Sequence, residues 1–230
     1  MISQRKKTLL ITLIKDYIKT AQPVSSGGLV ERYKLNISPA TVRNELADLE
    51  EEGYIHQPHT SSGRVPTAVA YQLFVDSLPA PAKLKGLKEE ELTSLEKIFD
   101  HNEAAYKQTA KIIADLSGNA VFWAFHKNNL YYTGLANLFA QPEFKQLNTV
   151  YDFSTIIDRL EDIIDDCFEE LAEGSQVLIG EQNPFGNFLS TVLVKYKDRN
   201  QSAVFGLLGP MRMDYVRNLS LAEFINKKFS

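Results

Sequence analysis

The feature that most constrains this sequence is a helix whose two ends are both marked. Ser38 is a good N-cap, because its hydroxyl can accept a hydrogen bond from a free N–H of the first turn. Pro39 suits the first helical position, where its missing N–H is not needed, and Gly53 is typical of the residue just beyond a C-terminus. The apolar residues between them recur at i, i+4 and i+7: Val42, Leu46 and Leu49. This pattern predicts an amphipathic helix that begins at Pro39 and ends before Gly53.

Polar side chains occupy the first two turns of this helix, off the apolar stripe. They are Thr41, Arg43, Asn44 and Glu45. Arg and Asn have planar, forked groups that match the edges of guanine and adenine, and Thr can contact a phosphate or a thymine methyl group. Four carboxylates follow toward the C-terminus, where phosphate would repel them: Asp48, Glu50, Glu51 and Glu52. Only the N-terminal half of the helix is therefore suited to face DNA.

The residues after Gly53 have the pattern of a β-hairpin. Residues 54–57 form one extended arm, residues 58–63 a polar tip that contains glycine, and residues 64–66 a second arm. Side chains that can donate hydrogen bonds to phosphate or sugar gather here: His59, Thr60, Ser61, Ser62 and Arg64. Arg64 could also enter a minor groove. A capped helix and a Ser/Gly turn are each common, but together they predict a recognition helix followed by a wing.

Two further helices are expected before this unit. Residues 3–20 carry apolar side chains at helical spacing, and Ser25 precedes a short second helix that runs to about Tyr33. Only a few residues separate the second helix from the third, as the helix-turn-helix geometry requires. Another helical stretch follows the wing at residues 68–78. The order predicts a winged helix-turn-helix domain over residues 1–78.

The net charge of the chain does not indicate DNA binding. The whole chain is at −4. Residues 1–78 hold nine Lys/Arg against eight Asp/Glu, or +1, which leaves −5 for the remainder. A near-neutral domain binds DNA weakly without sequence preference, so specific binding must depend on local placement of a few cations. The candidates are Arg5, Lys6, Lys7, Arg43 and Arg64, and we expect a moderate salt sensitivity.

The second part of the chain reads as a separate α+β domain. Residues 79–87, rich in Pro, Ala and Lys, are expected to be a short linker, and residues 88–230 the domain. Helices are predicted in two pieces within 88–116, at 153–171 and at 213–229, and strands near 120–126, 130–133, 176–180, 189–196 and 203–208. Helices packed on one antiparallel sheet give an α+β architecture. The carboxylates of the 153–171 helix lack His partners and a fixed loop, so we expect a solvated face rather than a metal site.

No catalytic or cofactor pattern appears. The sequence has four histidines: His56, His59, His101 and His126. They are not spaced as metal ligands, and no nucleophile lies in an activating motif such as GxSxG. The single Cys167 can form no internal disulfide, which favours a packing role and a reducing, cytoplasmic compartment. No apolar run approaches the ~20 residues that span a membrane. We therefore expect a non-enzymatic protein without catalytic residues, cofactor, metal or membrane segment.

Four collinear segments resemble one known family. The run ISPATVRNELADLEEEGYIHQPHTSSGRVPT, which begins at Ile37, is similar to the winged-helix domain of the heat-inducible transcription repressor HrcA family. Residues 134–144, 180–183 and 208–217 resemble that family's GLSNLLSQPEF, IGEEN and GPxRMDYxR segments. The resemblance implies a GAF-like C-terminal domain and repression of chaperone operons at an inverted-repeat operator, with release on heat stress. It further implies dependence on the GroE chaperonin.

The chain departs from that family at one place. Usual members carry a dimerising domain inserted before the GLSNLL segment, but here only residues 126–129 separate the two strands, which is enough for a hairpin turn. An inverted repeat is read by two copies related by a two-fold axis, so a homodimer is still expected. The GAF-like domain and the helices of 88–116 are the candidate interface.

Two functions of different classes follow. The leading hypothesis is a repressor that contacts DNA through its first helix, the start of its second helix, the recognition helix and the wing. The expected contact residues are Arg5, Lys6, Ser25, Ser38, Thr41, Arg43, Asn44, His59, Thr60, Ser61, Ser62 and Arg64. The alternative is a winged helix that serves protein contacts, or a GAF-like domain that senses a ligand, without sequence-specific DNA binding. The alternative predicts no preference among DNA sequences.

Overall fold

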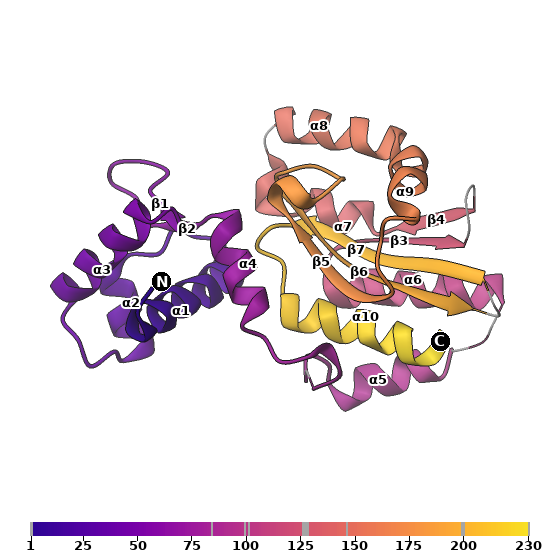
Figure 1. The fold of residues 1–230 in the computed structure, drawn as a ribbon, viewed down its shortest axis with the longest axis horizontal. Coiled ribbons are helices and arrows are strands. Elements are labelled where there is room, and N and C mark those ends of the chain that lie inside the picture. The colour runs from indigo at the N-terminus through magenta and orange to yellow at the C-terminus, as the bar shows by residue number, and fades with distance from the viewer. Residues whose placement is uncertain are drawn as a thin grey trace. The chain divides into compact units, whose positions relative to one another are not determined.

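The computed structural model of the protein describes residues 2–83, 85–98, 100, 102–125, 129–145, 147–198 and 201–229. The chain divides into two compact units, Met1–Leu78 and Pro79–Ser230 (Figure 1). Three sequence-based expectations fall wholly or partly outside the described residues. They are the hairpin turn expected at 126–129, of which only Asn129 is described, the role of His101, and the role of the Cys167 side chain.

The first unit is built from four helices and a small sheet. The helices are α1 (Gln4–Thr20), α2 (Ser26–Tyr33), α3 (Pro39–Glu51) and α4 (Ala68–Asp76). The wing consists of β1 (Ile55–His56) and β2 (Val65–Pro66), paired antiparallel with Ile55 opposite Pro66. A single bridge between Val24 and Arg64 adds a third extended segment to this sheet. The unit is a winged helix-turn-helix, as predicted.

The helix ends of the first unit are where the capping residues place them. Ser3, Ser25 and Ser38 each accept a hydrogen bond from a backbone N–H of the first turn of their helix. Gly53 has a φ of 79°, the left-handed conformation expected just after α3. The apolar faces of the helices meet in one core: Leu10, Leu13, Ile14, Leu29, Val42, Leu46, Leu49, Tyr71 and Phe74 are buried.

The second unit is a five-stranded antiparallel sheet between helices, with strand order β4-β3-β7-β6-β5. The strands are β3 (Ala120–Phe125), β4 (Leu130–Thr133), β5 (Gly174–Ile179), β6 (Leu189–Asp198) and β7 (Gln201–Pro210). The helices are α5 (Glu89–Glu96), α6 (Glu103–Ser117), α7 (Leu135–Phe139), α8 (Leu147–Asp158), α9 (Leu160–Phe168) and α10 (Tyr215–Phe229), with short 3-10 turns at Pro81–Lys83, Pro142–Lys145 and Gly180–Gln182. In Figure 1, α6 and α10 lie against one face of the sheet, and α7, α8 and α9 against the other. This arrangement is the predicted α+β class.

Alternation along β3 divides the core of this unit in two. Phe122 points to the side of α7, α8 and α9, where it joins Leu138, Phe153 and Leu208. Trp123 points to the other side, donates a hydrogen bond of 2.6 Å to the Tyr196 hydroxyl, and contacts an aromatic group of Tyr106, Phe205 and Phe229. The period of two in a strand buried on both faces explains why β3 shows no polar positions.

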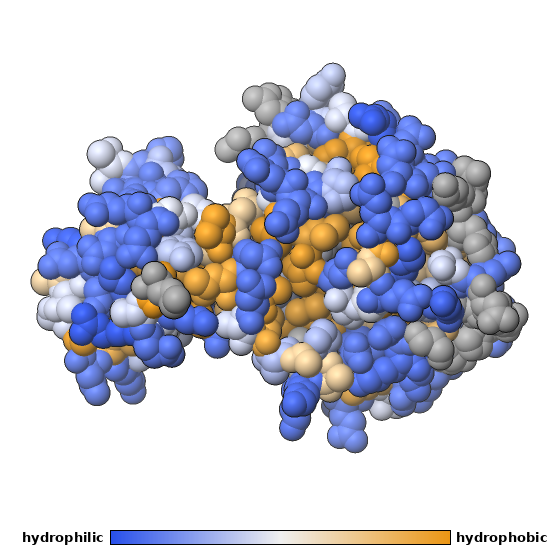
Figure 2. Space-filling model, viewed as in Figure 1, coloured by the Kyte–Doolittle hydropathy of each residue, from blue (hydrophilic) through white to orange (hydrophobic). Residues whose placement is uncertain are grey.

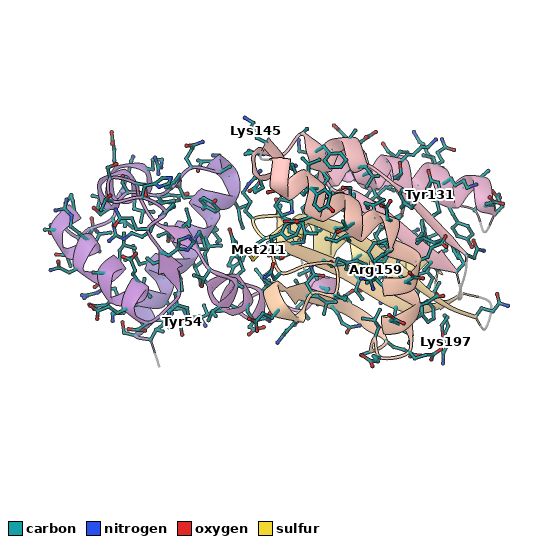
Figure 3. The ribbon with its side chains drawn as sticks, turned by 90° about the horizontal axis from the view of Figure 1, so that it is seen from above. Tyr54, Tyr131, Lys145, Arg159, Lys197 and Met211 are labelled. Atoms are coloured by element: carbon teal, nitrogen blue, oxygen red, sulfur yellow. The ribbon has the colours of Figure 1, made fainter. Side chains whose placement is uncertain are left out.

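Three expectations need correction or completion. The helix predicted at 153–171 is two helices, α8 and α9, with a bend at Arg159, which is labelled in Figure 3. The bend lets Phe153 of α8 and Phe168 of α9 reach the same core, whereas one straight helix would carry its far end off the sheet. Glu45, expected on the polar side of α3, is buried with 5% of its surface exposed. Helix α7 and the turn at Pro142–Lys145 were not expected from the sequence pattern.

Candidate nucleic-acid interface

The N-terminal turns of α3 present a polar, capped surface. The Ser38 hydroxyl accepts a hydrogen bond from the Thr41 N–H at 3.1 Å and lies 2.9 Å from the Thr41 hydroxyl. Arg43 and Asn44 follow in the next turn, and both are exposed. No ion pair of Arg43 is found within the described part of the chain. Among the described residues, neither the Arg43 guanidinium nor the Asn44 amide has a hydrogen-bond partner, so this turn offers both groups to a ligand.

The tip of the wing is held by its own side chains. Gln57 donates from Nε2 to the carbonyl oxygens of Thr60 at 2.9 Å and Ser62 at 2.8 Å. The Ser62 hydroxyl donates to the His59 carbonyl at 2.7 Å and accepts from the His59 N–H at 3.1 Å. These bonds leave the side chains of His59, Thr60 and Ser61 exposed at the tip. Sequence reasoning did not single out Gln57, and a glutamine at the base of a Gly-containing turn was the available signal.

The base of the wing is fixed to the segment before α2. Val24 and Arg64 exchange both backbone hydrogen bonds, each 2.9 Å long. A Cβ on Gly63 would lie 2.4 Å from the Val24 carbonyl carbon, so only glycine allows this approach. The wing therefore has a fixed anchor, and its position is not left to a flexible loop.

Three of the cations expected to contact DNA are already paired with carboxylates of α3. Arg64 donates from Nε and Nη2 to Oε2 of Glu50, at 3.1 and 2.9 Å. Lys6 lies 2.9 Å from Glu52 and 3.0 Å from Asp48, and its hydrogen bonds to these carboxylates raise the pKa of Lys6. Arg5 forms an ion pair with the buried Glu45. Carboxylates from Glu45 to Glu52 thus pair with neighbouring positive charges within the protein.

The N-terminus of α2 has a feature that sequence reasoning missed. A Cβ on Gly27, in the first turn, would meet nothing within 4 Å, and the backbone there is not left-handed. The fold itself therefore gives no reason for a glycine at this position. Close to it, the Arg32 guanidinium pairs with the buried Asp16 at 2.5 Å, which joins α2 to α1. Figure 2 shows hydrophilic residues over most of the visible surface of this unit.

The segments of the second unit singled out in the sequence form internal contacts. Arg212 donates to Glu143 at 2.5 Å and to Gln141 at 2.6 Å, which holds the segment after α7 against the end of β7. The Tyr215 hydroxyl lies 2.8 Å from the Ser190 hydroxyl in β6, and burial raises the pKa of Tyr215. These residues secure the fold, and they do not converge on an open site.

Arg217 makes the longest-range of these contacts. Its Nη2 donates to Oε1 of Glu91 at 2.6 Å, and this hydrogen bond lowers the pKa of Glu91. Its Nε donates to the Leu116 carbonyl at 2.7 Å. Arg217 in α10 therefore joins α5 and the end of α6.

Other kinds of site find little support in the described residues. They hold no group of three or more His, Cys, Asp or Glu that could bind a metal. None of their helices is long and apolar enough to cross a membrane. A half-open cleft of about 380 Å³ lies between α5, α10 and the turn at Pro81–Lys83, with Leu92 and Phe224 in its lining and charged ends from Lys85 and Glu89. A cleft of this size accommodates a small molecule, and half of its ten lining residues are polar or charged: Lys85, Glu89, Ser220, Glu223 and Lys227.

A winged helix-turn-helix unit that leads into an antiparallel α+β unit defines a two-domain transcriptional regulator. Residues 81–218 match the family described as HrcA protein C terminal domain, and the chain belongs to this HrcA family. A heat-inducible transcription repressor HrcA of Carboxydothermus hydrogenoformans is 27% identical, with 100% of this chain and 98% of that protein covered. The HrcA repressor of Geobacter sulfurreducens is 53% identical over 91 residues, which cover 40% of this chain and 27% of that protein.

One solved structure has the same fold. It is a crystal structure of a hypothetical protein, with a TM-score of 0.78, 17% sequence identity and coverage of 100% of this chain and 98% of that one. The alignment with the Carboxydothermus repressor extends over 334 residues, whereas this chain has 230. Because both proteins are covered almost end to end, the roughly one hundred extra residues of that relative lie inside its chain. This agrees with the short form expected from the sequence.

Proposed function

We propose that this chain is a sequence-specific DNA-binding repressor that reads an inverted-repeat operator of chaperone operons. The observation that carries the proposal is the exposed pair Arg43 and Asn44 on the second turn of a capped α3. These are the side chains with bidentate preference for guanine and adenine, and this is the part of the helix that enters the major groove. We assign base reading to Arg43 and Asn44.

Phosphate contacts are assigned to the groups that flank the recognition helix. Ser38 and Thr41 lie at its N-terminus, and Ser25 caps α2. Helix N-termini and hydroxyl groups commonly bind phosphate oxygens. The exposed wing tip, His59, Thr60 and Ser61, supplies a second set of donors. Arg5 and Lys6 are weaker candidates than the sequence alone indicates, because each is paired with a carboxylate of α3.

An inverted repeat requires two copies of the reading unit. We therefore propose a homodimer on the operator. The longer relative has about a hundred internal residues that this chain lacks, so the dimer contacts are assigned to the second unit. Release on heat stress and a need for GroE belong to the same proposal. They are tested by measuring the operator-binding fraction after thermal inactivation and recovery, with and without GroE.

The first experiment is selection followed by titration. A random-sequence duplex pool is enriched with the purified chain, and the recovered duplex, one half of it and a scrambled version are titrated by fluorescence anisotropy at one salt concentration. The proposal expects the recovered sequence to be an inverted repeat and to bind at least a hundredfold more tightly than the scrambled duplex. If the chain binds the half-site as tightly as the full repeat, the proposed homodimer on the operator is wrong. If all three duplexes bind alike, a winged helix that serves protein contacts takes its place.

A further inference from the structure

Arg64 is held by its backbone and by its side chain at the same time. Its backbone N–H and C=O are both bonded to Val24, and its guanidinium makes two hydrogen bonds to Oε2 of Glu50. The two side chains are largely shielded, with 21% of Arg64 and 32% of Glu50 exposed. Gly63 precedes it at a place where no side chain fits. This arginine is therefore one of the more constrained residues of the wing.

Arg64 and Glu50 belong to the two parts that must meet DNA together. Glu50 lies in the last turn of α3, whose first turns carry Arg43 and Asn44. Arg64 immediately precedes β2, the return arm of the wing. The ion pair joins the far end of the recognition helix to the base of the wing. An error of about 1 Å between two reading elements is enough to weaken a preorganised site.

Moving Arg64 onto a phosphate would have an unfavourable consequence. The side chain would leave Glu50, and an unpaired carboxylate would remain beside the polyanion. While the pair is intact, the charge of Glu50 is compensated at the base of the wing. The geometry therefore favours an Arg64 that stays on Glu50 in the complex.

We propose that Arg64 and Glu50 form a strut that sets the position of the wing relative to α3, and that Arg64 is a positioning residue rather than a DNA contact. The inference rests on the proposed function and replaces the expectation that Arg64 enters a minor groove. It gives Glu50, an acidic residue in a DNA-binding unit, a positive role in sequence discrimination.

The test compares Glu50→Ala and Arg64→Ala with Glu51→Ala in the full chain. Glu51 is the neighbouring exposed carboxylate of α3, so its variant measures the effect of removing one negative charge. The recovered duplex and its scrambled version are titrated at four salt concentrations. If the strut exists, we expect the Glu50→Ala and Arg64→Ala variants each to bind the recovered duplex at least fivefold more weakly than the Glu51→Ala variant does. We also expect an unchanged slope of log affinity against log salt, and a double variant no worse than the worse single one.

If Arg64 binds phosphate instead, the two single substitutions are expected to change DNA affinity in opposite directions. Glu50→Ala would then bind every duplex more tightly, and Arg64→Ala would lower the salt slope by about one ion. Either result overturns the strut. Glu50→Gln, which keeps an acceptor for the guanidinium, is expected to recover part of the discrimination, and melting curves of each variant separate lost binding from lost folding. A wild-type chain that does not discriminate removes both the proposed function and the strut, whereas discrimination that survives in Glu50→Ala removes the strut alone.

Discussion

Arg43 is the residue on which the proposed base reading depends most directly. Replacing it with Ala is expected to cost about 1–3 kcal/mol of binding free energy on the recovered duplex and much less on the scrambled one. The physical reason is that a bidentate contact to a base edge discriminates, whereas a phosphate contact does not. Anisotropy titration of both duplexes measures the difference, and Lys19→Ala, an exposed cation in the last turn of α1, is the control. Equal losses on both duplexes would remove Arg43 from base reading.

Gly27 gives a test in which folding and binding move in opposite directions. Alanine fits the space and the backbone at this position, so Gly27→Ala is expected to stabilise the chain by up to about 1 kcal/mol. If DNA backbone approaches the N-terminus of α2, the added methyl group weakens binding to all duplexes alike. Thermal melting and titration on the same sample check both effects. A variant that is more stable and binds normally would place the DNA backbone elsewhere.

At the scale of single residues, the sequence predicted which side chains are exposed better than it predicted which charged side chains form ion pairs. The exposure of Arg43 and Asn44 follows from the helical period, because both lie off the stripe that contains Val42 and Leu46. The ion pairs of Arg5, Lys6 and Arg64 join segments far apart in sequence, and no local pattern encodes such a pairing. Burial of Glu45 has the same origin, since α1 brings Arg5 to it.

At the scale of elements, the N-cap of α3 is expected to carry measurable stability. Ser38→Ala removes an acceptor from the Thr41 N–H and should cost about 0.5–2 kcal/mol of the free energy of unfolding. Ser61→Ala, at the exposed tip of the wing, is the matched control and should change stability by less than 0.5 kcal/mol. Urea denaturation of each variant provides the comparison. Equal stability of the two variants would contradict the capping role.

Element ends were predictable where a residue type marks them, and unpredictable elsewhere. Ser25, Ser38 and Gly53 mark the ends of α2 and α3 by their own chemistry. The bend between α8 and α9 has no proline or glycine at Arg159 to mark it, and residues of both helices pack into one core. Strand order β4-β3-β7-β6-β5 is likewise a property of the whole sheet, because a strand's own sequence does not name its neighbours.

For the molecule as a whole, Arg217 and Glu91 give the second unit an acid-sensitive connection. The hydrogen bond from Arg217 holds the pKa of Glu91 below its ordinary value. Because the folded-state pKa is depressed, this stabilisation is present above the ordinary value, near 4.5, and is lost as the pH falls through the folded-state pKa. We expect the difference in Tm between wild type and Glu91→Gln to be constant near neutral pH and to shrink below about pH 4.5. A constant difference down to pH 3 would contradict this coupling.

The internal neutralisation of charge in the first unit bears on how such a repressor competes within a genome. Bulk DNA captures a strongly cationic protein and holds most of its copies in reserve, so that operator occupancy changes little when some copies are lost. A reading unit with a net charge of only +1, in which Arg5, Lys6 and Arg64 are paired with carboxylates, would hold a much smaller reservoir. In a repressor that works as proposed, the occupied fraction of the operator would follow the number of folded copies almost directly. A modest loss of folded protein on heating would therefore lower operator occupancy without delay.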